Sequence, residues 1–237
     1  MEKINIQFHN TLNQEIWDNE VLRPNVRKTL LTIANEFVKF LKVDKEAKDI
    51  LFLGSLANYN YTELSDVDLH IIFDFNEIGD DAKFVKEYFN AKKFIWNAEH
   101  DIKVYGHEIE CYVQDTNEKN SSTAVFSVLN NEWLKKPSVK KPTIDTQAVL
   151  TKAKDFSQRI EMAKGDLESL TDLKEKIKNM RMSGLAKFGE FSTENLVFKA
   201  LRNSNKIKKL ADYAKDIYDK ELSLTEAFHI DWNELVT

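Results

Sequence analysis

The 237-residue chain contains one cysteine, Cys111, only three prolines and only six glycines. One cysteine excludes an internal disulfide and a zinc site built from cysteines. Few prolines and glycines favour long, regular helices and strands. No apolar run approaches the roughly 20 residues that a membrane-spanning helix needs, and residues 1–5 contain no hydrophobic region of a signal peptide. We therefore expect a cytoplasmic protein with no membrane segment.

Charged residues are plentiful but unevenly distributed. The chain has 34 Lys and Arg against 39 Asp and Glu, a net charge of -5. Residues 174–209 hold ten basic and three acidic residues, a local balance of +7, so the remainder of the chain carries -12. An acidic body with one basic segment suits a site that holds cations at one point and binds an anionic substrate at another.

The hydrophobic pattern changes near Lys140. Before it, apolar periodicity predicts helices over 12–22, 25–41 and 80–96 and strands over 49–53, 66–75, 100–105 and 107–114, the last two joined as a hairpin at Gly106. Residues 121–134 are helix-compatible, and residues 135–144 have the composition of a linker. The chain therefore predicts an α+β fold whose first domain, residues 1–140, has a small mixed β-sheet with flanking helices.

The second domain, residues 141–237, is predicted to be all-helical. Residues 145–182 form one long helix or two consecutive ones, with breaks expected at Gly184 and Gly189. Ser192 or Thr193 is expected to cap the next helix, which continues to about Tyr218.

That last helix carries a stripe of cations. Lys199, Arg202 and Lys206 are spaced i, i+3, i+7, so they share one face if the helix is continuous. They form either a solvated helix face or a surface that meets a triphosphate or an RNA backbone.

The stretch from Gly54 to Asp68 combines a Gly-Ser turn with two aspartates at the start of an apolar run. Alternate residues of a strand face the same side, so Asp66 and Asp68 point together while Val67 faces the core. Two carboxylates this close share a proton or a cation at neutral pH. Hard divalent cations such as Mg²⁺ prefer oxygen ligands, and a pair of them can activate a hydroxyl and stabilise a leaving group.

The Gly-Ser turn supplies the phosphate half of this predicted site. Gly54 allows a sharp turn and the close approach of a ligand, and Ser55 adds a hydroxyl donor. Residues 56–59 are expected to begin a helix whose free N–H groups favour a phosphate.

A third carboxylate is expected from the strand over 107–114, which offers Glu108 and Glu110. Glu110 lies mid-strand, where a charge is costly unless it is used, and Glu108 lies nearer the hairpin turn. We favour Glu110. His70 shares the face of Asp68 and is expected to be a polar wall residue rather than a metal ligand.

Gly54-Ser55, followed after a short segment by Ser65-Asp66-Val67-Asp68-Leu69, resembles the signature of the DNA polymerase β-like nucleotidyltransferase superfamily, over about residues 50–114. The resemblance implies that Asp66 and Asp68 ligate two Mg²⁺ ions, which Mn²⁺ could replace. It also implies that Glu110 ligates the catalytic ion and helps to deprotonate the acceptor. By the same resemblance Gly54, Ser55 and Ser65 bind the NTP.

The whole chain also resembles uncharacterised nucleotidyltransferase-like proteins of bacteriophages, which would place it in the host cytoplasm. Many small members of the superfamily have a second glycine where this chain has Tyr59. Tyr59 or Tyr61 could therefore stack on a base instead.

These implications predict transfer of a nucleoside monophosphate from an NTP to a hydroxyl, with release of pyrophosphate. The acceptor is an RNA 3′ end, which the basic helix favours, or a protein hydroxyl, a small molecule or a second nucleotide. Lys199 and Arg202 are candidates to bind the triphosphate. Two other hypotheses stay open. The protein is a catalytically silent nucleotide or RNA sensor, or it is one half of a toxin–antitoxin-type module whose protein partner docks on the helical domain.

Overall fold

The computed structural model describes residues 8–120, 122–138 and 143–223. Within these ranges the chain divides into two compact units, one up to residue 143 and one from residue 144, and each is described by itself. The predicted boundary near Lys140 lies outside the described residues. None of the described helices is long and apolar enough to cross a membrane.

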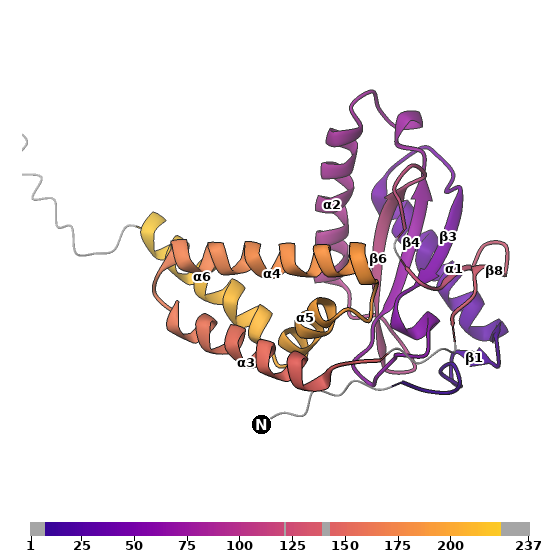
Figure 1. Cartoon of the computed structure of the whole chain (residues 1–237). Coiled ribbons are helices and arrows are strands. Elements are labelled where there is room, and N and C mark those ends of the chain that lie inside the picture. Colours follow the sequence, from indigo (N-terminus) through magenta and orange to yellow (C-terminus); the bar gives the residue numbers. More distant parts are fainter. Residues whose placement is uncertain (1–7, 121, 139–142, 224–237) are drawn as a thin grey trace, which may run out of the picture. The chain divides into compact units, whose positions relative to one another are not determined.

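The first unit is built on a six-stranded mixed sheet with the strand order β5-β6-β4-β3-β7-β8 (Figure 1). Its strands are β3 (Asp49–Leu53), β4 (Val67–Phe73), β5 (Lys103–Val104), β6 (His107–Asp115), β7 (Val125–Ser127) and β8 (Glu132–Lys135). Strands β4 and β6 pair in parallel, and the other neighbours pair antiparallel. This mixed sheet with its helices confirms the predicted α+β class.

Two long helices cover one face of the sheet. Helix α1 (Pro24–Leu41) begins with proline in its first turn and ends at Lys42 in the left-handed conformation. Helix α2 (Ala82–Glu99) joins β4 to β6 and is capped by the carboxylate of Asp81. Their apolar stripes share one core with alternate residues of the strands, among them Leu30, Phe37, Phe52, Val67, Leu69, Phe89, Ile109 and Cys111. The intervening residues of β4 and β6 therefore face away from this core.

Two predictions in this unit are wrong. Instead of a helix, residues 12–22 contain a turn and a two-stranded sheet, β1 (Trp17–Asp18) and β2 (Val21–Leu22). Instead of a helix near residues 121–134, the described part forms the β7–β8 hairpin. The rings of Trp17, Phe126 and Trp133 pack against one another at centroid distances of 4.8–5.1 Å. This long-range aromatic packing overrides the local helical pattern.

The second unit contains four described helices, α3 (Thr146–Met162), α4 (Leu167–Phe188), α5 (Thr193–Asn203) and α6 (Lys206–Leu222). Helix α5 packs against α3 and α4, and α6 packs against α4. Their facing stripes bury a second set of apolar side chains, among them Phe156, Ile160, Leu173, Ile177, Val197 and Leu201.

Four positions in this unit test the helix boundaries that the sequence predicts. Gly189 ends α4 and Ser192 caps α5, as predicted. Gly184 does not break the helix, because it lies inside α4 and packs against the start of α5. The single helix predicted to run to Tyr218 is interrupted at Asn205, whose φ is 58°. Lys206 therefore lies on a different helix from Lys199 and Arg202.

Candidate functional site

The Gly-Ser turn lies against the carboxylate of Asp68. Strands β3 and β4 pair so that Leu53 faces Asp68, and Gly54 follows directly. Gly54 has φ 79° and ψ -163°, a region essentially restricted to glycine. A Cβ at this position would overlap Oδ2 of Asp68 and lie 2.9 Å from its Cγ. The turn therefore requires glycine for its conformation and for the room that Asp68 occupies.

Two of the predicted acidic residues, Asp68 and Glu110, lie on one face of adjacent strands. The parallel pairing of β4 and β6 sets Asp68 directly beside Glu110. Val67 and Ile109 are buried on the opposite side, while Asp68 is half-buried and Glu110 is exposed. Asp66 precedes β4 by one residue and has no partner in the strand register. The sheet therefore sets two of the three selected positions, Asp68 and Glu110, directly beside each other, and the place of Asp66 in the site stays a prediction.

The choice between the two glutamates of β6 follows from their neighbours. Glu108 pairs with Lys103 across the β5–β6 hairpin, with 3.8 Å between the carboxylate oxygen and the ammonium nitrogen. Glu110 has Asp68 beside it instead. The register therefore supports Glu110 as the third carboxylate.

The carboxylates of Asp66, Asp68 and Glu110 can be compared with the ligands that a metal ion requires. Carboxylate oxygens on one face are the ligands that Mg²⁺ prefers, so the residue types and their register fit. Among the described residues, no three His, Cys, Asp or Glu side chains are gathered closely enough to hold a metal ion. Binding of an ion would therefore need the carboxylates to converge from these positions.

Two serines connect the turn to the segment that precedes Asp66. The Ser55 hydroxyl donates to Oγ of Ser65 at 2.8 Å, and that same oxygen accepts the N–H of Thr62 at 2.9 Å. The helix expected over 56–59 is only a three-residue 3₁₀ turn, η1 (Ser55–Ala57). A turn this short gives no helix N-terminus for a phosphate, so that part of the prediction is wrong.

A buried histidine supports the same segment and was not selected by the sequence reasoning. Nδ1 of His107 lies 2.7 Å from the carbonyl oxygen of Ser65, and its Nε2 lies 3.4 Å from the amide nitrogen of Asn13. A carbonyl only accepts, so Nδ1 donates and Nε2 accepts from Asn13. His107 thus fixes the backbone immediately before Asp66.

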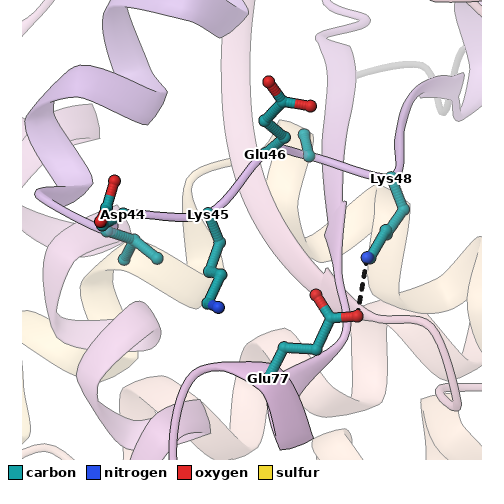
Figure 2. A pocket seen from close by; sticks show the side chains of 7 residues that line it. Asp44, Lys45, Glu46, Lys48 and Glu77 are labelled. Atoms are coloured by element: carbon teal, nitrogen blue, oxygen red, sulfur yellow. Dashed lines mark hydrogen bonds and ion pairs between the residues drawn. The ribbon is translucent and has the colours of Figure 1, made fainter.

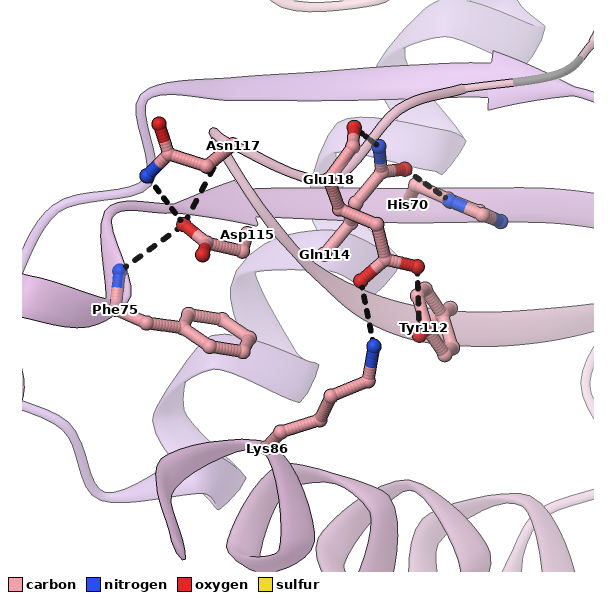
Figure 3. Close-up of polar contacts among 8 residues, drawn as sticks. All are labelled: His70, Phe75, Lys86, Tyr112, Gln114, Asp115, Asn117 and Glu118. Carbon is pink, nitrogen blue, oxygen red and sulfur yellow. Dashed lines mark hydrogen bonds and ion pairs between the residues drawn. The ribbon is translucent and has the colours of Figure 1, made fainter. Parts of the chain in front are cut away.

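A polar network continues along the same sheet face beyond the acidic residues (Figure 3). Nδ1 of His70 lies 2.8 Å from Oε1 of Gln114. Burial of the imidazole lowers the pKa of His70, against the raising effect of the hydrogen bond with Gln114. Burial, together with the nearby carboxylate of Glu118, raises the pKa of Tyr112. Glu118 also forms an ion pair with Lys86 at 3.0 Å.

The two tyrosines considered for base stacking have other roles. Tyr59 is buried in the main core, so its assignment as a stacking residue is wrong. The ring of Tyr61 stacks on His9 with 3.9 Å between centroids. Tyr61 is half-buried, so a role for it in base stacking stays a prediction.

The basic residues predicted to bind the triphosphate belong to the helical unit. Lys199 is half-buried and Arg202 is exposed on α5. Lys206, the third cation of the predicted stripe, forms an ion pair with Glu161 at 2.7 Å. A role for Lys199 and Arg202 in nucleotide binding stays a prediction.

An open pocket lies at the other end of β3 and β4 (Figure 2). It is lined by residues 43–48, which precede β3, and by Glu77 of the 3₁₀ turn η2 (Phe75–Glu77), which follows β4. Gly54 follows β3 and Asp66 precedes β4, so the candidate site lies at the opposite strand ends. Lys48 and Glu77 form an exposed ion pair across the pocket at 2.7 Å, a contact of little energetic weight.

Fold and site together define an α+β protein in which a Gly-Ser turn packs against paired acidic positions on one sheet face. No protein-family model matches the chain, and no curated protein matches it. Among solved structures, the STING-associated CdnE c-di-GMP synthase from Capnocytophaga granulosa aligns with 84% of this chain and 83% of its own, at 12% identity and a TM-score of 0.25. A TM-score this low does not establish a shared fold.

Proposed function

We propose that the protein is a metal-dependent nucleotidyltransferase that transfers a nucleoside monophosphate from an NTP to a hydroxyl acceptor and releases pyrophosphate. One observation carries the proposal: the Gly54 turn packs against Asp68, which lies in register with Glu110. Phosphoryl chemistry of this kind depends on holding a triphosphate beside carboxylate-bound cations.

The residues would divide the work as follows. Asp66, Asp68 and Glu110 would hold Mg²⁺, which when bound supplies charge neutralisation for the phosphates and lowers the pKa of a hydroxyl. The glycine backbone and Ser55 would hold the triphosphate. The acceptor oxygen then bonds to the α-phosphorus as the bond to the pyrophosphate oxygen breaks, and Glu110 would take the acceptor proton.

The acceptor is proposed to be RNA rather than a protein or a small molecule. The basic segment 174–209 supports this, since a run of cations is the usual footprint of a phosphate backbone. Part of that charge is already used, because Lys206 and Lys209 approach Glu161 at 2.7 and 3.9 Å.

A label-transfer assay tests the proposal. The protein is incubated with Mg²⁺ or Mn²⁺, with each α-labelled NTP in turn, and with a cell extract that offers RNA, proteins and small molecules. Transfer by the wild type and not by an Asp66→Ala/Asp68→Ala variant is expected, and the labelled fraction identifies the acceptor.

Label transfer, together with NTP binding and the effect of expressing the protein, separates the alternatives. NTP binding without transfer would indicate a nucleotide sensor. Equal transfer by both proteins would show that the active site lies elsewhere. Growth arrest on expression, or a tight complex with a second protein, would indicate a toxin–antitoxin-type module.

Metal binding is tested separately from activity. Mn²⁺ binding, followed by electron paramagnetic resonance, should be strong in the wild type and largely lost in the Asp66→Ala/Asp68→Ala variant. Equal Mn²⁺ binding by both proteins would show that Asp66 and Asp68 do not hold the metal ion.

A further inference from the structure

The sheet face of the candidate site carries a second pair of residues in register, His70 on β4 and Tyr112 on β6. They lie two residues beyond Asp68 and Glu110, about 7 Å further along the strands. Their rings approach to 4.8 Å between centroids at 45°. The acidic pair is thus followed directly by an aromatic pair on the same face.

The orientation of the His70 ring is fixed by a buried side chain. Gln114 is buried, and its amide nitrogen donates to the carbonyl oxygen of Glu118 at 3.1 Å. Its Oε1 is therefore the atom 2.8 Å from Nδ1 of His70, and an oxygen can only accept. Nδ1 carries the ring proton, and Nε2 presents a lone pair.

That lone pair lies on the side of the ring away from Gln114. In Figure 3 the second ring nitrogen points away from Gln114 and away from Phe75, which follows the end of β4. Asp68 lies two residues before His70 on the same face of β4. No hydrogen bond reaches Nε2 from the described part of the chain. His70 is half-buried, and Nε2 is not among the fully buried atoms that lack a partner in the described part of the chain, so a donor from a ligand can reach it.

The surroundings indicate which part of a substrate would supply the donor. A phosphate offers only acceptor oxygens, which a lone pair repels. The two cations nearby are engaged, Lys86 with Glu118 at 3.0 Å and Lys93 over the Tyr112 ring at 4.9 Å. The nucleoside half of an NTP offers donors at the base edge and at the ribose hydroxyls.

We propose that Nε2 of His70 accepts a hydrogen bond from the nucleoside half of the bound NTP, from a base-edge N–H or from a ribose hydroxyl. The inference rests on the proposed function, because it takes the triphosphate to lie at the Gly54–Ser55 turn. His70 is then a substrate-contacting residue that selects among nucleotides, with Gln114 as its positioning residue.

The wild-type protein alone provides the first test. The NTP that binds most tightly is chosen from ATP, GTP, CTP and UTP in the absence of acceptor. Three analogues of it, lacking in turn the base-edge donor, the 2′-hydroxyl and the 3′-hydroxyl, are then titrated. One analogue should bind about five- to a hundredfold more weakly. Equal affinity for all three and for the parent would overturn the inference.

Two substitutions of His70 provide the matched test. His70→Asn keeps an amide N–H near the position of Nδ1 but has no acceptor at the position of Nε2. It should bind the parent NTP as weakly as the wild type binds the critical analogue, with no further loss for that analogue. His70→Gln reaches the position of Nε2 and should recover part of the affinity. Parent affinity unchanged in His70→Asn would overturn the inference.

The outcomes separate this inference from the proposed function. If the wild type transfers label and His70→Asn binds the NTP as tightly as the wild type, only the role proposed for His70 is overturned. Donor-dependent binding without transfer supports His70 and overturns the transferase. Failure to bind any NTP overturns both. If His70→Asn does not fold, the wild-type analogue series decides.

Discussion

At the scale of single residues, Gly54 links the sharp backbone turn after β3 to the position of the Asp68 carboxylate. Its φ of 79° and ψ of -163° allow β3 to turn sharply, and the missing Cβ leaves room for the Asp68 carboxylate. Gly189 has nearly the same conformation, φ 74° and ψ -164°, but nothing within 4 Å of its missing Cβ. The chain thus provides a natural control that separates backbone strain from the contact with Asp68.

Gly54→Ala and Gly189→Ala should both be destabilised by backbone strain, by about 1–3 kcal/mol. Only Gly54→Ala should also displace Asp68 and lose NTP binding and label transfer. Thermal unfolding and the transfer assay measure the two effects. Full activity in Gly54→Ala would show that the packing against Asp68 is unimportant for function.

Residues of the candidate site differ in how far the sequence predicts them. Asp66, Asp68 and Glu110 follow from the alternation of two strands, which is a local pattern. The role of His107 follows from a contact with Ser65, 42 positions away, and that of His70 from a contact with Gln114, 44 positions away. No local pattern carries such pairings, because they depend on the register of the sheet.

At the scale of elements, the junction of α4 and α5 is packed closely around Gly184. A Cβ there would lie 2.6 Å from Cβ of Glu194 and 2.7 Å from Oγ of Ser192. Alanine favours a helix over glycine by about 1 kcal/mol, so propensity and packing make opposite predictions for this position.

Gly184→Ala should destabilise the helical unit, because the Cβ of Glu194 cannot move without shifting α5. Exposed Ala186 of the same helix serves as the reference, and Ala186→Gly should cost about 1 kcal/mol through propensity alone. Urea denaturation of the two variants measures both effects. A more stable Gly184→Ala variant would show that α5 is free to move.

The start of α5 should be sensitive to acid. The backbone N–H of Glu194 and the ammonium of Lys152, 3.1 Å away, lower the pKa of the Glu194 carboxyl. A lowered folded-state pKa gives stability that is present above the unfolded value of about 4.3 and is lost as the pH falls through the folded value.

Glu194→Gln should therefore be less stable than the wild type at pH 7, by up to about 1 kcal/mol. The difference should shrink toward pH 3. Hydrogen exchange of the α5 amides at several pH values measures it. A difference that does not change with pH would assign the effect to packing rather than to charge.

The elements themselves were predicted where periodicity was strong. Helix α1, helix α2 and strands β3, β4 and β6 were predicted close to their observed bounds. The short strands near Trp17 and Phe126 were missed, because their rings are held by packing between distant segments. The break at Asn205 was missed because an asparagine in the left-handed conformation leaves the apolar pattern unchanged.

At the scale of the whole molecule, the α+β class follows from the pattern of strands and helices alone. What the pattern does not give is whether the two compact units act on one substrate. The predicted role of Lys199 and Arg202 requires that they do, since the acidic positions belong to the other unit.

A Lys199→Ala/Arg202→Ala variant should bind its NTP about tenfold more weakly, as expected for lost charge-assisted hydrogen bonds. Lys208→Ala, which removes an exposed cation of α6, should bind like the wild type. Equilibrium titration with NTP compares the three proteins. Equal loss in both variants would indicate a general effect of charge, and no loss in either would confine the site to the first unit.

The central claim is that Glu110, in register with Asp68, belongs to a nucleotidyltransferase active site. The most direct measurement compares pyrophosphate release by Glu110→Gln and Glu108→Gln in the presence of Mg²⁺, an NTP and the acceptor identified by label transfer. Both variants remove one carboxylate from the same strand. Glu110→Gln should slow release about 10²–10⁴-fold, and Glu108→Gln, which loses only an exposed ion pair, should release at close to the wild-type rate. Wild-type release by Glu110→Gln, or equal losses in both, would contradict the account.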